Sequence, residues 1–449
     1  MARETETFLL TLAQDLIAAA KRAGADAADV MAVQSLSLGA SRRLGKLEDI
    51  ERSESRDLGL RVFLGQRQAF ISSTDLDTKK FGTLAERAVA MAKLAPEDPY
   101  CGLADASLLA KSWPNLDLED PTEPSADRLA ERAAAAEEAA LAMPGITTSE
   151  GAGAGWGRGA VALVTSGGFA GAYGSSTFSV NCSVLAGEGT AMERDYEFSS
   201  ERFEADLGDP AEVGREAARR AVKRLNPRKV KSASVPVVYD PRASNGLVGH
   251  LAGAINGASI ARGVSFLKGD LGKQLFARGI RIVDDPLKRR GHRSKPFDGE
   301  GVATTRRELI EDGVLTTWIL DTASAKKLGL KTTGNAARGT GGPPSPSTTN
   351  LYMEAGTLSP DALIADIKQG LYVTELIGMG VNGVTGDYSR GAAGYWIENG
   401  KLAYPVSEIT VAGNLKAMFA NMTPANDLAF RYGTNAPTLR VEGMTVAGM

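Results

Sequence analysis

Apolar residues recur at helical spacing in two stretches near the start of the chain, residues 5–23 and 79–94. Between these two predicted helices, alternating apolar and polar residues predict a strand at 30–38. A hairpin is predicted over 51–73, where two alternating runs flank a turn at Gly65. Helix, strands and helix in this order are typical of a two-layer α+β unit.

The same two periods return after a connection at 96–124 that is rich in proline and acidic residues. This connection is longer than the usual loop, and we interpret it as an ordered surface excursion rather than a partner-contacting arm. Helices are predicted at 125–143 and 210–225, and alternation over 159–187 predicts two strands. The run GAGAGWGRG at 151–159 is interpreted as a turn-rich lead into the first of them.

The second half begins with a stretch that we call the organising stretch, VPVVYDPRASNGLVGHLAGAINGASIARGVSFLKGDLGKQLF. Residues 235–240 predict a short strand, and residues 243–260 predict a helix with an apolar residue every four positions. A second stripe on this helix is made of glycine, namely Gly246, Gly249, Gly253 and Gly257. Glycine inside a helix costs about 1 kcal/mol relative to alanine, so we expect this stripe to pack closely against another backbone.

Two hairpins with strong turn signals follow. ELIEDGVLTTWIL turns at Asp312-Gly313 and YWIENGKLAYPV at Asn399-Gly400, and both pairs favour the positive φ angles of a type I′ turn. Between them, residues 332–350 form a long loop of glycine, proline, serine and threonine. The two hairpins predict a β-rich second half.

A short helix is predicted at 361–370. The run NPRKVKSAS, residues 226–234, is typical of a linker, and we place the domain boundary near residue 230. The fold class expected from these elements is α+β in two domains. Residues 1–230 form an N-terminal α/β domain, and residues 231–449 form a mainly antiparallel β domain crossed by the glycine-rich helix.

Composition narrows the class of protein. Charged residues make up 23% of the chain and the net charge is -3, which indicates neither a nucleic-acid surface nor binding to an anionic membrane. The two cysteines, Cys101 and Cys182, form no disulfide framework and suit a reducing cytoplasm. The first residues, MARETETFLL, include acidic side chains and no apolar h-region, so no signal peptide is expected. The uncharged segment 159–187 is rich in glycine, serine and threonine, which favours buried strands over a membrane span.

A lone histidine, His250, lies among the helix glycines, and two interpretations of it are open. It is either a helix histidine satisfied by a carbonyl or water, or a residue that lines a substrate-facing cavity. A zinc peptidase needs three protein ligands and a carboxylate base. Position i+4 from His250 is Ala254, and the other histidine, His292, lies in the basic loop KRRGHRSK. The chain is therefore expected to hold no metal and no catalytic residue of its own.

Other chemistry is equally sparse. No G-x-S-x-G elbow is present. In the loop at 332–350, Asn335 and Arg338 are candidates to hold a peptide carbonyl or carboxylate, and a purely structural loop is the alternative.

The organising stretch, together with PFDGEGV, LGLKTTGNAARG, TTNLYMEAG and GVTGDYSRGAAGYWIENGKLAYPVSEITVAGNL, resembles the TldD/PmbA family, specifically its PmbA (TldE) branch. The TldD branch carries a zinc-binding H-E-x-x-x-H motif at this helix. Placed over that motif, His250 matches the first histidine, while Leu251 and Ile255 replace the glutamate and the second histidine. The family's cysteine ligand comes from the C-terminal domain, but both cysteines here precede residue 230.

The resemblance implies the non-catalytic subunit of a cytoplasmic heterodimeric zinc metallopeptidase. A TldD-like partner would supply the zinc, and the pair would cleave unfolded peptides, with roles in precursor-peptide maturation and antitoxin proteolysis. Two alternatives stay open from the residues: a homodimeric peptide-binding or scaffold protein, and a peptidase with an unrecognised non-zinc site. The isolated chain is a possible homodimer.

Overall fold

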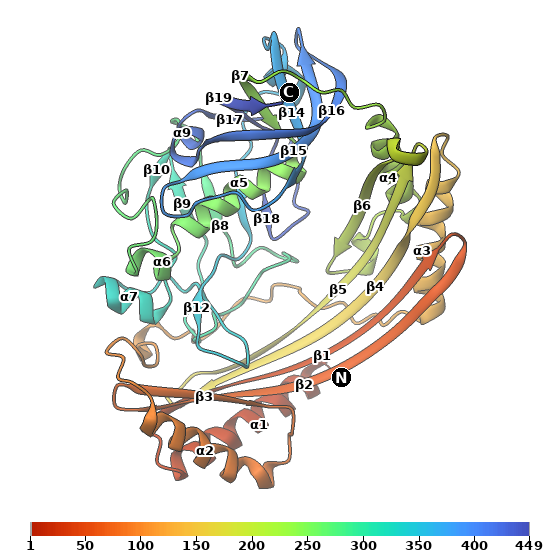
Figure 1. Cartoon of the computed structure of the whole chain (residues 1–449). Coiled ribbons are helices and arrows are strands. Elements are labelled where there is room, and N and C mark those ends of the chain that lie inside the picture. The colour runs from red at the N-terminus through yellow and green to blue at the C-terminus, as the bar shows by residue number, and fades with distance from the viewer. Residues whose placement is uncertain (1, 449) are drawn as a thin grey trace.

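The first half of the chain builds one antiparallel sheet of long strands. The computed structural model describes residues 2–448, and the sheet has the order β3-β2-β1-β4-β5-β6. The strands are β1 Ala27–Arg43, β2 Lys46–Leu64, β3 Arg67–Ser73, β4 Ile146–Thr165, β5 Ala170–Ala186 and β6 Glu193–Glu201. Figure 1 shows the sheet as a curved layer whose inner side faces the second half of the chain.

The glycine run at 151–159 lies within β4, which corrects its interpretation as a turn-rich lead. Alternate residues Ala152, Ala154 and Trp156 are buried under helices, and the glycines between them lie on the inner side of the sheet. Because β4 pairs with both β1 and β5 from Ala152 onward, the ladder holds the glycines at 153–159 extended. Local turn propensity yields here to strand pairing on both sides.

Four helices cover the outer side of this sheet (Figure 1). They are α1 Ala2–Arg22, α2 Phe81–Leu94, α3 Ala126–Leu141 and α4 Pro210–Lys223. The first pair shares a core with β1, β2 and β4, and the second pair shares one with β4 and β5. Cys182 belongs to the second core, where burial raises the pKa of its thiol to about 12. Short 3-10 turns connect the elements at Thr78–Lys80, Ala106–Leu108, Gly189–Ala191 and Glu204–Asp206.

The second half packs a helix, α5 Pro241–Ala254, between two sheets. The larger sheet has the order β16-β15-β14-β7-β19-β17 and the smaller one β10-β9-β8-β13-β18. The larger contains β7 Ala233–Tyr239, β14 Gln369–Ile377, β15 Asp387–Glu398, β16 Lys401–Asn414, β17 Met422–Pro424 and β19 Leu439–Ala447. The smaller contains β8 Ile282–Asp284, β9 Arg307–Glu311, β10 Val314–Leu315, β13 Leu351–Met353 and β18 Thr434–Asn435. A separate pair joins β11 Ala336–Ala337 to β12 Ser345–Pro346.

Both predicted hairpin turns are present in the second half. Asp312, Gly313, Asn399 and Gly400 all have positive φ, as the turn type requires. Most strand pairs are antiparallel; β14 with β7 and β13 with β18 are parallel. The helix expected at 361–370 is shorter, since α8 Pro360–Ile364 ends before β14 begins. The remaining helices are α6 Gly257–Ala261, α7 Thr322–Leu328 and α9 Leu415–Ala420.

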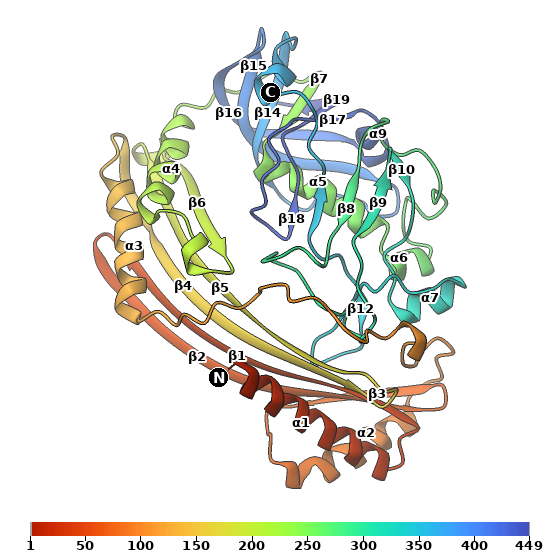
Figure 2. The ribbon, with the colours of Figure 1, turned by 180° about the vertical axis from the view of Figure 1, so that it is seen from behind.

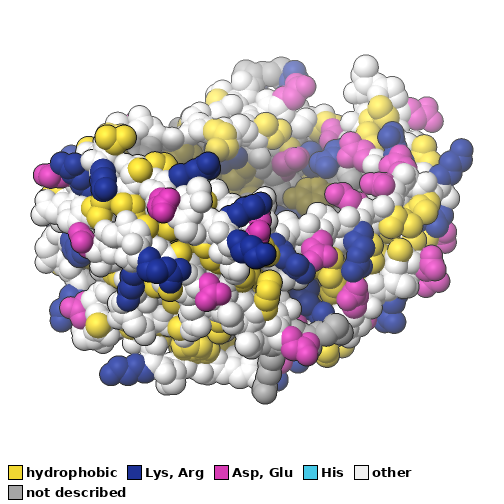
Figure 3. All heavy atoms as spheres, turned by 90° about the horizontal axis from the view of Figure 1, so that it is seen from below, with side chains coloured by type: hydrophobic (Ala, Val, Ile, Leu, Met, Phe, Trp, Pro, Cys, Tyr) yellow, Lys and Arg dark blue, Asp and Glu magenta, His cyan; other side chains and the backbone are white. Residues whose placement is uncertain are grey.

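The connection at 96–124 is ordered and runs between the two halves (Figure 2). Its Leu116 carbonyl accepts from the Arg290 backbone of the second half, and its Leu118 carbonyl accepts from Ser176 of the first sheet. It therefore fastens both halves together rather than projecting from the surface. Basic and acidic side chains are interspersed on the face seen from below (Figure 3).

Candidate functional site

Residues at the N-terminus of helix α5 favour the start of a helix at Pro241. The Asp240 side chain accepts a hydrogen bond from the Arg242 backbone, and Pro241 occupies the first helical turn. The helix ends at Ala254, which corrects the single helix expected over 243–260. Asn256 is responsible, because its side chain accepts from the Ala258 backbone and starts the separate helix α6.

The two faces of α5 differ sharply in their surroundings. Leu247, Val248 and Leu251 are buried in the core of the second half. A methyl group added at Gly246, Gly249 or Gly253 would meet no atom within 4 Å. The expectation of close packing is therefore wrong for these three glycines within this chain. It is correct for Gly257, where an added Cβ would lie 2.7 Å from the Ile319 carbonyl oxygen.

A pocket of about 340 Å³ opens over this bare face of α5. Gly249 and Gly253 form part of its wall, and His250 lies between them along the helix. The remaining lining residues are Ala254, Ser259, Val264, Ser265, Phe266, Met379, Val381, Gly383, Arg390 and Leu415. The pocket is therefore mostly apolar, with one histidine and one arginine, and its lining contains no carboxylate.

His250 lines this pocket, and its surroundings favour the neutral imidazole. Burial lowers the pKa of the imidazole, and the nearby Arg390 guanidinium lowers it further. The ring lies edge-on to Tyr388, with centroids 5.9 Å apart. The imidazole is accordingly neutral at pH 7 and can offer one donor and one acceptor to a ligand. Its position on a pocket wall is compatible with the cavity-lining interpretation, which stays a prediction.

Arg390 is a residue that sequence reasoning missed. It projects from β15 on the same face of the strand as the buried Tyr388, and its Nε donates to the Ile377 carbonyl at 3.3 Å. The only local signal was the alternation of Tyr388 and Arg390 in DYSRGAAG. Nothing in that alternation tells which arginines of a strand end beside a helix that is distant in sequence.

The residues around α5 do not fit the zinc site that the TldD-branch motif would build. Leu251 and Ile255 are buried in the core, and the pocket beside His250 has no carboxylate or thiol in its lining. Within residues 2–448, no group of three or more His, Cys, Asp or Glu side chains is placed to hold a metal ion. His292 lies in a different environment, where burial and the nearby Arg202 lower the pKa of its imidazole.

Asn335 and Arg338 lie away from the pocket and contact the protein itself. The Asn335 amide donates to Asp284 Oδ2 at 2.7 Å, and the Arg338 guanidinium pairs with Asp29 of β1. The Arg338 side chain is only 1% exposed. These contacts favour the alternative of a structural loop for both residues, because their polar groups hold the loop and join the two halves.

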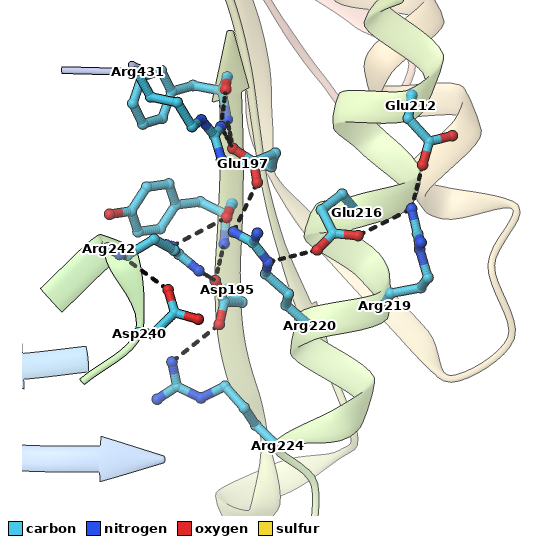
Figure 4. Close-up of polar contacts among 12 residues, drawn as sticks. Asp195, Glu197, Glu212, Glu216, Arg219, Arg220, Arg224, Asp240, Arg242 and Arg431 are labelled. Atoms are coloured by element: carbon cyan, nitrogen blue, oxygen red, sulfur yellow. Dashed lines mark hydrogen bonds and ion pairs between the residues drawn. The ribbon is translucent and has the colours of Figure 1, made fainter. Parts of the chain in front are cut away.

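A second set of ion pairs fixes the start of α5 to the first sheet (Figure 4). Arg242 of α5 contacts Asp195 of β6 at 2.8 Å, and Asp195 also contacts Arg224 at 3.3 Å. Glu197, on the same strand, pairs with Arg431 and with Arg220. The Arg242–Asp195 pair thus fixes the start of α5 to β6, and the other pairs extend the contact between the two halves.

Comparison with known proteins gives the class of protein that this architecture defines. Residues 28–92, 119–225 and 232–448 match PmbA/TldA metallopeptidase domain 1, central domain and C-terminal domain. The chain is 41% identical over 425 residues to Metalloprotease PmbA of Escherichia coli O157:H7, covering 94% of this chain and 92% of that one. It is 38% identical to a Metalloprotease PmbA homolog of Haemophilus influenzae, covering 96% and 94%.

Solved structures agree with this assignment. A Bacteroides thetaiotaomicron protein described as a candidate modulator of DNA gyrase superposes with a TM-score of 0.90 at 30% identity, covering 98% of each chain. TldE from Thermococcus kodakarensis has the same fold, with a TM-score of 0.86 at 21% identity over 97% of this chain and 99% of that one. The chain belongs to the PmbA/TldD metallopeptidase family. No helix in residues 2–448 has the length and apolar character needed to cross a membrane.

Proposed function

We propose that this chain is the TldE-like, non-catalytic subunit of a cytoplasmic heterodimeric zinc metallopeptidase. The partner is a TldD-like chain that holds the zinc, its ligands and the glutamate base. The substrate is an unfolded or flexible peptide, as in precursor-peptide maturation or antitoxin proteolysis. This chain completes the chamber in which the peptide is held.

The bare glycine row of α5 is the observation that carries the proposal. Three glycines on one exposed helix face cost stability and gain no packing within the chain. Such a cost is explained when another backbone, of a partner or a peptide, approaches the helix closely. The apolar side chains beside it, including Val264 and Met379, are 43% and 92% exposed, which further favours a contact outside this chain.

The donor set around His250 supports the non-catalytic part of the proposal. His250 is one potential metal ligand, and Leu251 and Ile255 stand where the motif has its glutamate and second histidine. A zinc peptidase needs three protein ligands and a carboxylate base. The chain keeps the helix, the sheets around it and the ion pairs that orient it. A framework maintained in this way without its donor set is consistent with chemistry supplied by a related partner.

The test is cleavage of a flexible fluorogenic peptide by this chain, by a TldD-like chain from the same cell, and by their mixture. We expect only the mixture to reach full activity. A control mixture, in which the partner's zinc-motif glutamate is replaced by glutamine, should be inactive. Equal cleavage by this chain alone would contradict the proposal and favour a non-zinc site on this chain.

A homodimeric peptide-binding or scaffold protein is the other candidate, because a second copy could also cover the glycine row. Light scattering of the isolated chain and of the mixture separates the two. A stable homodimer that ignores the TldD-like chain would replace the heterodimer in the proposal.

A further inference from the structure

The pocket over α5 contains one positively charged side chain and no negatively charged one. Arg390 is its only permanently charged lining residue, and none of the lining residues is aspartate or glutamate. Two other buried arginines, Arg242 and Arg338, pair with carboxylates, and a third, Arg202, donates to the carbonyls of Gly291, His292 and Ser176. No ion pair links Arg390 to a carboxylate anywhere in the described chain, residues 2–448. Asp387 precedes it by three positions on β15 and so lies on the opposite face of the strand, where it contacts Thr385.

The contact made by Arg390 leaves its binding edge available. Its Nε donates to the Ile377 carbonyl, which steadies the side chain, while neither Nη atom has a protein acceptor within residues 2–448. Two Nη groups in a fixed plane match the two oxygens of a carboxylate. His250, neutral for the reasons given above, can add one hydrogen bond without competing for the anion.

The other lining residues indicate which chemical group next to a bound carboxylate would fit the pocket. Phe266, Val381 and Leu415 supply apolar surface, while Gly249 and Gly253 leave the helix backbone open to close approach. A volume of about 340 Å³ lies at the small end of ligand pockets and suits one or two residues rather than a long segment. An apolar side chain can enter while its own backbone lies along the glycines.

We propose that this pocket binds the C-terminal carboxylate of a peptide that ends in an apolar residue, with Arg390 as its anchor. The inference deepens the proposed function, since it assigns this chain a part in holding the peptide that the pair cleaves. It predicts that the isolated chain recognises peptide ends before any partner is present. The source of the carboxylate is the chain terminus rather than an acidic side chain, because the pocket is short and apolar around the single arginine.

The experiment measures binding of fluorescent pentapeptides to the full-length chain by anisotropy. One peptide ends in leucine with a free carboxylate, a second is its C-terminal amide, and a third is the amide with a central glutamate. We expect the free acid to bind at least roughly tenfold more tightly than either amide, as fits a lost hydrogen bond to a charged group. Equal binding of the acid and the plain amide overturns the proposal. Equal binding of the acid and the glutamate peptide overturns the assignment to a chain terminus.

Variants locate the effect. Arg390→Gln should remove the preference for the free acid, whereas Arg278→Gln, at an exposed arginine outside the pocket, should keep it. Retention of the preference in a folded Arg390→Gln chain overturns the proposal. If that variant does not fold, the binding of the free-acid and amide peptides to the unmodified chain still tests the proposal. Activity of the mixture with a TldD-like chain is scored separately, so failure of the subsite and failure of the heterodimer give different results.

Discussion

Arg338, in the loop of the second half, forms a buried ion pair with Asp29 of the first sheet, 309 residues earlier in the chain. Asp29 also contacts Arg61 at 2.5 Å, and Arg338 donates to the Gly59 carbonyl at 3.3 Å. Close backbone contact supports the pair, since a Cβ added at Gly59 would lie 2.3 Å from the Thr340 carbonyl oxygen. The pair therefore fixes the long loop onto the sheet.

Replacement of Arg338 tests this contact. Arg338→Ala leaves Asp29 buried with one partner instead of two, so we expect the free energy of unfolding to fall by roughly 3 kcal/mol. Arg52→Ala is the matched control, because Arg52 and its partner Glu123 are 54% and 39% exposed, and such pairs contribute less than about 1 kcal/mol. Chemical denaturation measures both. Equal effects would mean that the buried pair contributes no more than a surface pair.

Glu300 gives a pH-dependent prediction. Burial raises the pKa of this carboxyl to about 7, and the neighbouring Asp298 charge adds to the effect, while hydrogen bonds from Thr322 oppose it. Between the ordinary value of 4.5 and about 7, the folded protein therefore holds more protons than the unfolded chain. The contribution of Glu300 to stability is lost as pH rises through that window.

Glu300→Gln should consequently flatten the fall in stability between these pH values. At pH 8 we expect the variant to be more stable than the original chain by roughly 1–3 kcal/mol, since glutamine accepts from Thr322 without a charge. Glu48→Gln, at an exposed position, should leave the profile unchanged. Thermal or urea melts from pH 4 to pH 8 provide the measurement. A Glu300→Gln chain that is less stable at pH 8 than at pH 5 by the original margin would show that another group controls the profile.

Two glycines in successive helices should respond in opposite ways to the same change. Gly253→Ala meets open space in an exposed helix and should stabilise the isolated chain by roughly 0.5–1 kcal/mol. Gly257→Ala places a methyl group 2.6 Å from a Leu320 methyl carbon and should destabilise it by roughly 1–3 kcal/mol. Melting of the isolated chain distinguishes them. Destabilisation by Gly253→Ala would mean that this face is covered in solution, as in a homodimer.

Zinc content is expected to be substoichiometric in the purified chain. His250 has no second or third metal-binding side chain beside it in the described pocket, so any bound zinc should leave with a mild chelator. Elemental analysis after chelation, with a TldD-like chain treated in parallel, is the measurement. One tightly held zinc per chain, absent from a His250→Ala variant, would reverse this conclusion.

Local sequence was sufficient for much of the fold. Both positive-φ turn pairs, at Asp312-Gly313 and Asn399-Gly400, form where they were predicted, because few residues other than glycine and asparagine or aspartate adopt that backbone. The amphipathic helices of the first half also form, and the Ser125 side chain caps α3 by accepting a hydrogen bond from the Arg128 backbone. These elements depend on residues within one or two turns of each other. The family resemblance too rests on ordered local segments.

Tertiary structure decided the rest, because it depends on contacts between distant residues. The glycines at 153–159 are extended only because β1 and β5 pair with them on either side. The spacing of the glycines in α5 shows that they share one face of the helix. It does not show whether another element packs on that face, and the structure leaves it bare. Nothing in the sequence around Arg338 and Arg390 distinguishes their surroundings. Arg338 forms an ion pair with Asp29, whereas Arg390 has no ion pair with a carboxylate in the described chain. The charge of a site is set by what the fold brings beside it.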